Sequence, residues 1–169
     1  MACAIYGLFV YYFSQPPGSS VGGPMQQAQH TPGQQIEAAM LDRARATVLQ
    51  DNCWLTSKQV AELAGLRDGS ASTELGSWKH DRLIFSISAQ GIELFPAYGL
   101  DHQNSYHPLP EISKIIETLG QSKDGWGLAY WFASANSFIG GRRPQDLLVM
   151  DPEAVVAAAA DEADGFMHG

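Results

Sequence analysis

Two adjacent arginines stand in a glycine- and proline-containing stretch near the end of the chain. Residues 140–144 read Gly-Gly-Arg-Arg-Pro. Glycine adopts positive φ without steric strain, Pro144 suits the first turn of a helix, and Arg143 favours extended backbone because proline follows it. The spacing predicts a rigid basic corner that presents guanidinium groups to a partner, or else a plain turn between two helices.

Other reactive residue types lack the spacing of a catalytic site. There is no glycine-rich phosphate loop after a strand and no nucleophile elbow, and no histidine and acid are placed to activate Ser134 or Ser137. The five histidines are scattered, and Cys3 and Cys53 do not have the spacing of zinc ligands. We therefore expect neither an enzyme nor a metal or cofactor site.

The acidic charge of the chain restricts its partners. The net charge is −8, and residues 106–169 hold nine acidic and four basic side chains. An acidic surface repels nucleic acid and favours a basic protein partner. Two cysteines so far apart in the sequence suit a reducing compartment, so we expect a cytoplasmic protein.

The first 33 residues do not have the composition of a folded domain. Residues 1–13 are apolar, but about 20 apolar residues are needed to span a bilayer. Residues 14–33 are rich in proline, glycine, serine and glutamine, which favours disorder. We interpret residues 1–33 as a disordered or mis-started tail, with Met25 as an alternative start, and expect no association with membranes.

Residues 34–104 predict a helical arm followed by a winged-helix-like module. An amphipathic helix is expected over 35–50 as a packing or dimerisation arm. Thr56 and Gln59 form a capping-box pattern for a second helix that ends at Gly65, and a third helix is expected over 72–80. Two short apolar runs around the turn 89–91 then predict a β-hairpin, the wing of such a module.

DNA contact would lie on the third helix of this module and beside it. The module is net negative and has no arginine within that helix, so the electrostatic pattern of a DNA reader is missing. A dimerisation or protein-docking module is therefore the favoured alternative. The candidate DNA-binding residues are Lys58, Ser72, Thr73, Lys79 and Arg82.

Residues 105–169 predict a small helical domain. An apolar stripe runs from Ile112 to Leu119, and Asp124 can cap a helix that is rich in aromatic residues. A last helix is expected from Asp151 as N-cap to Gly165 as its stop, followed by a short tail. The fold class is thus mainly α with a small β-hairpin.

The glycine-arginine corner and its surroundings also resemble a known family. The stretch 135–148, followed by Asp-Pro-Glu-Ala-Val at 151–155, is similar to the C-terminal toxin-binding domain of Xre/ParS-like antitoxins, which are encoded beside RES-domain toxins. The similarity runs from about residue 109 to 160 and includes the tryptophan-containing helix of that family. A weaker likeness over 55–101 corresponds to the winged-helix-like module that some members carry.

The resemblance implies an antitoxin of a type II toxin–antitoxin pair. Such a protein binds and neutralises an NAD-degrading RES-type toxin and forms a homodimer or a larger hetero-oligomer with the toxin. Many antitoxins also repress their own operon by binding operator DNA. The alternative is a winged-helix transcriptional regulator whose C-terminal domain mediates dimerisation. The candidate toxin-binding residues are Trp126, Trp131, Asn136, Gly140, Gly141, Arg142, Arg143, Asp161, Glu162 and Phe166.

Overall fold

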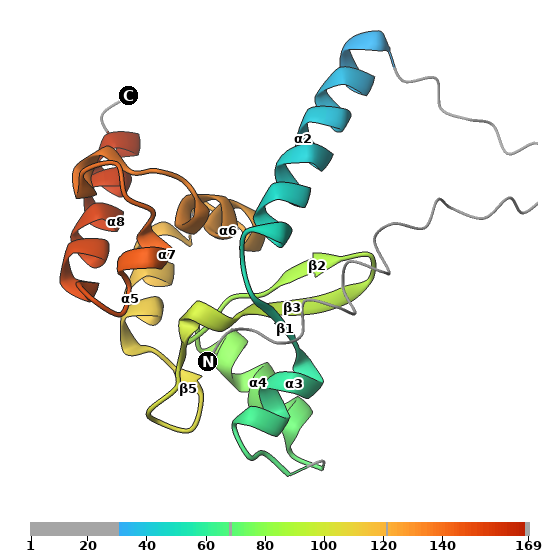
Figure 1. Ribbon diagram of the computed structural model, residues 1–169, viewed down its shortest axis with the longest axis vertical. Helices are drawn as coiled ribbons and strands as arrows, with labels where there is room; N and C mark the ends of the chain where they lie inside the picture. The colour runs from blue at the N-terminus through green and yellow to red at the C-terminus, as the bar shows by residue number, and fades with distance from the viewer. Residues whose placement is uncertain (1–30, 68, 121, 168–169) are drawn as a thin grey trace, which may run out of the picture. The chain divides into compact units, whose positions relative to one another are not determined.

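The computed structural model describes residues 31–67, 69–120 and 122–167 of the chain and is mostly helical with small antiparallel sheets (Figure 1). Most of the expected tail lies outside these residues. The chain divides into two compact units, 1–44 and 45–169, so the division falls within helix α2 (Pro32–Gln50). In the first unit, Ile36 and Met40 are exposed, and a role of this arm in dimerisation stays a prediction.

The second unit begins with a three-stranded sheet and two short helices. Strand β1 (Trp54–Thr56) leads into α3 (Ser57–Leu63) and α4 (Ala71–His80), followed by β2 (Ile87–Ala89) and β3 (Ile92–Pro96). The strands are antiparallel in the order β1-β3-β2. Strand β1 was not predicted, because three residues are too few to show an alternating pattern.

Local signals set the ends of these elements. The Thr56 hydroxyl accepts the backbone N–H of Gln59 at 3.3 Å, and the Gln59 side chain accepts that of Thr56 at 2.8 Å, which confirms the capping box. Gly65 follows α3 with φ of 65°. Gln90 and Gly91 form the hairpin turn with φ of 52° and 77°, the paired positive values that fit the twist of a two-residue hairpin.

The remainder of the second unit is built from helices. After a short 3-10 helix (Ala97–Gly99), the strands β4 (Leu100–Asp101) and β5 (His107–Pro108) pair and lead into α5 (Pro110–Leu119). Helix α6 (Gly125–Ala133), the 3-10 helix η2 (Ser137–Ile139), α7 (Pro144–Leu147) and α8 (Pro152–Met167) follow. Asp124 caps α6 by accepting the Gly127 N–H at 2.7 Å, and Asp151 caps α8 by accepting the Ala154 N–H at 3.2 Å, both as predicted.

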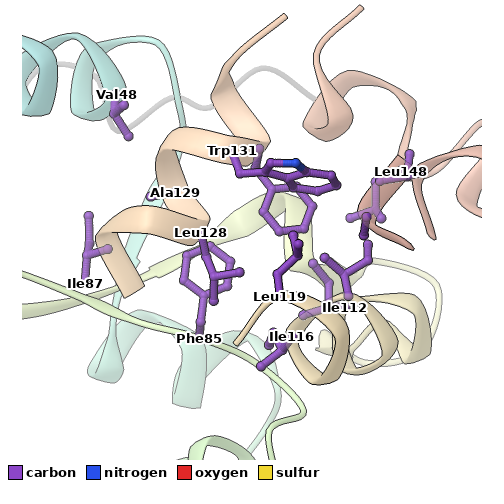
Figure 2. Close-up of a cluster of buried hydrophobic side chains, with 14 of the residues drawn as sticks. Val48, Phe85, Ile87, Ile112, Ile116, Leu119, Leu128, Ala129, Trp131 and Leu148 are labelled. Atoms are coloured by element: carbon purple, nitrogen blue, oxygen red, sulfur yellow. The ribbon is translucent and has the colours of Figure 1, made fainter. Parts of the chain in front are cut away.

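One hydrophobic core joins the regions on both sides of residue 104, where we expected a domain boundary. Its buried side chains come from the end of α2, the sheet, and helices α5, α6 and α8 (Figure 2). Phe85 stacks on Phe132 of α6, with ring centroids 5.8 Å apart and an interplanar angle of 9°. A smaller core lies between α3, α4 and the sheet and includes Val60, Trp78 and Phe95.

Two expectations differ from the structure. Gly165 does not end α8, which continues to Met167, because Gly165 does not adopt the positive φ with which glycine terminates a helix. Cys53 is half-buried beside the smaller core and is not a free thiol, which differs from the reducing compartment that we inferred from the spacing of the cysteines; Cys3 lies outside the described residues. Among the described residues, no helix combines the length and apolar character needed to cross a membrane.

The space around two glycines predicts opposite effects of alanine substitution on stability. A Cβ at Gly125 would lie 2.2 Å from the backbone oxygen of Ser86, whereas a Cβ at Gly76 within α4 would meet nothing within 4 Å. We expect Gly125→Ala to lower the free energy of unfolding by about 1–3 kcal/mol through overpacking. Gly76→Ala should raise it by up to about 1 kcal/mol through helix propensity. Urea unfolding of both variants measures this, and equal stabilities would contradict the close approach of α6 to the sheet.

Candidate functional site

The predicted corner is a closed loop between α6 and α7. The N–H of Asn136 donates to the Arg142 oxygen at 3.0 Å, and the N–H of Gly141 donates to the Asn136 oxygen at 2.8 Å. Gly140 and Gly141 have φ of 70° and 77°, so both lie in the left-handed region, as the sequence predicted. The loop is therefore fixed by its own backbone hydrogen bonds and by two residues that favour glycine.

The Asn136 side chain holds the start of η2 within this loop. Its Oδ1 accepts the N–H of Phe138 at 2.9 Å. Asn136 is half-buried, whereas Phe138 is exposed to 52%. Asn136 is thus a positioning residue, and the exposed aromatic side chain beside it was not among the predicted site residues.

The two arginines have different environments. Arg143 is extended, with φ of −83° and ψ of 135°, as expected before a proline. Its Nε and Nη2 donate to the two carboxylate oxygens of Asp146 at 2.7 and 2.9 Å, and this hydrogen bonding raises the pKa of the Arg143 guanidinium. Arg142 is exposed and forms no ion pair with any described residue. Arg142 is therefore the arginine available to a partner, whereas Arg143 braces the first turn of α7.

Helix η2, which belongs to this loop, packs against α8, whose last turns are acidic. Asp161 is exposed, but the half-buried Glu162 forms an ion pair with Lys123 at 2.9 Å. Glu162 thus ties α8 to the segment between α5 and α6. Phe166 lies in the last turn of α8, and its side chain lies outside the described part of the chain.

The two predicted tryptophan anchors have structural contacts. Trp131 lies in the larger core (Figure 2) and is only 7% exposed. Its ring packs edge-on against Phe132, with ring centroids 5.0 Å apart. Trp126 is half-buried and donates its indole N–H to the backbone oxygen of Ser88 at 3.3 Å. The Arg45 guanidinium lies over the Trp126 ring, 5.2 Å from the ring centroid, in a cation–π contact. In this conformation Trp131 has no surface for a partner, and Trp126 joins α6 to β2 and to the end of α2.

The candidate DNA-binding residues lie on and beside α3 and α4. Lys79 forms an ion pair with Glu93 of β3, and Lys58 forms one with Glu62 at 3.9 Å. Both pairs line a groove of about 380 Å³ between the two helices. Ser72, Thr73 and Arg82 are exposed. Two of the three basic candidates are thus paired with a carboxylate within the same module.

Glu93 accepts several hydrogen bonds at one end of this groove. Partial burial raises the pKa of the Glu93 carboxyl, but hydrogen bonds from Lys79 and Ser86, together with the charge of Lys79, outweigh burial and leave the pKa below its ordinary value. The Ser86 hydroxyl lies 2.9 Å from Glu93 Oε1. The carboxylate therefore links α4 to the hairpin.

Within the described ranges, no group of three or more histidine, cysteine or acidic side chains is arranged to hold a metal ion. Comparison with protein families, with curated proteins and with solved structures finds no match to this chain.

The corner predicts a strong preference for glycine at positions 140 and 141. A Cβ at either position would meet nothing within 4 Å, so any effect of substitution comes from the positive φ. We expect Gly140→Val and Gly141→Val each to destabilise by about 1–3 kcal/mol. Gly140→Asn should be milder, because asparagine tolerates the left-handed region. Thermal unfolding measures this, and valine variants that melt like the wild type would contradict a strained turn.

The ion pair of Lys79 predicts a pH-dependent contribution to stability. The pKa of the Glu93 carboxyl is lower in the folded protein than its ordinary value of 4.5. The stability that the ionised carboxylate contributes is therefore complete above pH 4.5, and it is lost as the pH falls through the pKa of the folded state. Glu93→Gln should therefore destabilise the protein at neutral pH and converge with the wild type in acid. Denaturant unfolding from pH 7 to pH 3 tests this, with Glu62→Gln in the more exposed pair as control. A constant difference between Glu93→Gln and wild type would refute the interpretation.

Proposed function

We propose that the chain is the antitoxin of a type II toxin–antitoxin pair and neutralises an NAD-degrading RES-type toxin. The observation that carries the proposal is the loop 136–142, which is closed by hydrogen bonds and exposes Arg142. The residues that close and turn this loop are among those that resemble the toxin-binding domain of Xre/ParS-like antitoxins. A preorganised surface loop suits binding to a protein, because little conformational entropy is lost on association.

The charge of the same region supports a cationic partner site. Asp161 and Asp164 are exposed on the last turns of α8, the helix against which η2 packs. A toxin that degrades NAD needs positive charge to hold the phosphates of its substrate, and exposed carboxylates are complementary to such a site. We propose that this acidic end competes for the phosphate-binding region, and that the complex is a homodimer of the antitoxin or a larger hetero-oligomer with the toxin.

A second candidate function is transcriptional regulation through a winged helix. The element order α2-β1-α3-α4-β2-β3, with the sheet order β1-β3-β2, favours it, because two packed helices precede a hairpin that pairs with the first strand. The pairing of Lys58 and Lys79 with carboxylates weighs against tight DNA binding, since phosphate contacts need available cations. We therefore rank this function second.

Co-expression with the neighbouring reading frame tests the first proposal. We expect the neighbouring product to arrest growth and deplete NAD when expressed alone, and to co-purify with this chain without arresting growth when both are expressed. A neighbouring product that is harmless alone, or that this chain neither binds nor neutralises, would contradict the antitoxin function.

The same preparations separate the two functions. Fluorescence anisotropy with the DNA upstream of the gene, at several salt concentrations, measures DNA binding by the chain alone and by the complex. Tight binding by the chain alone, together with no binding to the neighbouring product, would favour the regulator.

A further inference from the structure

One exposed aromatic side chain of the loop lies outside both hydrophobic cores. Phe138 is the one aromatic residue among the large, exposed hydrophobic side chains of the described residues, at 52%. Its neighbour Ile139 packs against the larger core, whereas Phe138 belongs to neither hydrophobic cluster. The short helix η2 thus directs one apolar side chain inward and leaves the next one in solvent.

The backbone at Phe138 is fixed before any partner binds. Its N–H donates to the Asn136 side chain, and the loop is closed by the hydrogen bonds of Asn136 with Arg142 and Gly141. A rigid, exposed aromatic residue is the usual form of an interface hot spot, because it brings a large apolar area at a small entropic cost.

A charge accompanies this aromatic residue. Arg142 lies on the same closed loop, is exposed, and forms no ion pair within the described residues, while the carboxylate of Asp146 is occupied by Arg143. The loop therefore offers an apolar ring together with an available guanidinium. The complementary surface is an apolar pocket with a carboxylate at its edge.

We infer that Phe138 is the anchor of the protein-binding surface, inserting into an apolar pocket of the partner while Arg142 pairs with an acidic side chain beside that pocket. The identity of the partner as the toxin rests on the proposed function. The inference adds a residue to the interface and shifts the cationic contact from the arginine pair to Arg142 alone. It also makes Trp131 and Arg143 supporting residues of the loop rather than contacts.

Binding of single variants to the co-purifying toxin tests this inference. We expect Phe138→Ser to weaken the affinity by about 30-fold or more, as for other hot-spot residues, and Phe138→Leu to recover part of it. Arg142→Gln should weaken binding and reduce its salt dependence. Val149→Ser is the matched control, since Val149 is 77% exposed and lies outside the loop, and it should bind like the wild type. Thermal unfolding should give wild-type stability for Phe138→Ser and Val149→Ser.

Affinity and crosslinking outcomes separate this inference from the proposed function. If wild-type chain binds the toxin and Phe138→Ser binds within threefold of it, the anchor is refuted while the antitoxin function stands. If the wild-type chain does not bind the toxin, both the anchor and the antitoxin function are refuted. A photoreactive benzoylphenylalanine at position 138 should crosslink to an apolar pocket that has an Asp or Glu at its rim. Crosslinks to a polar surface, or none in a complex that forms, would overturn the inference.

Discussion

The stacking of Phe85 on Phe132 is the contact on which the arrangement of the second unit depends. Phe85 lies just before β2 and Phe132 lies in α6, so this pair joins the sheet to the C-terminal helices. Gly125 permits the approach, because any side chain at this position would collide with the Ser86 backbone. Because α6 is fixed on the sheet, the start of the loop that follows α6 is fixed as well. Side chains of α7 and α8 complete the larger core.

The distribution of charge follows from this packing. Several of the ten lysines and arginines are engaged with carboxylates: Lys79 with Glu93, Lys123 with Glu162, and Arg143 with Asp146. Partly buried pairs of this kind organise local structure and occupy cations that a ligand would otherwise contact. Arg142 is therefore distinguished by its environment and not by its residue type, which is identical to that of its neighbour.

Sequence patterns predicted the features that depend on adjacent residues. The capping box at Thr56, the hairpin turn and the positive φ of Gly140 and Gly141 were all confirmed, because each follows from backbone geometry within a few residues. The partner of Arg143 was missed although Asp146 stands three residues later, a spacing at which helical side chains meet. Contacts between distant residues left no such signal: nothing near Lys79 indicates Glu93, and the crowded aromatic residues of 126–132, although typical of a core, do not tell which tryptophan is buried. The antitoxin function depends on a surface and on a partner, which local sequence patterns do not specify.

The hydrophobic core that spans residue 104 determines whether the helical segment with the loop can be excised from the protein. A domain that folds alone can be excised or grafted onto another protein, but the helical segment that carries the loop shares Phe85, Ile87 and Leu94 with the sheet. Cutting the chain at residue 104 would uncover the apolar face of α6 and release the origin of the loop. The loop and the sheet therefore form one cooperative folding unit. A ligand that binds the loop stabilises the sheet by the same free energy by which it stabilises the loop.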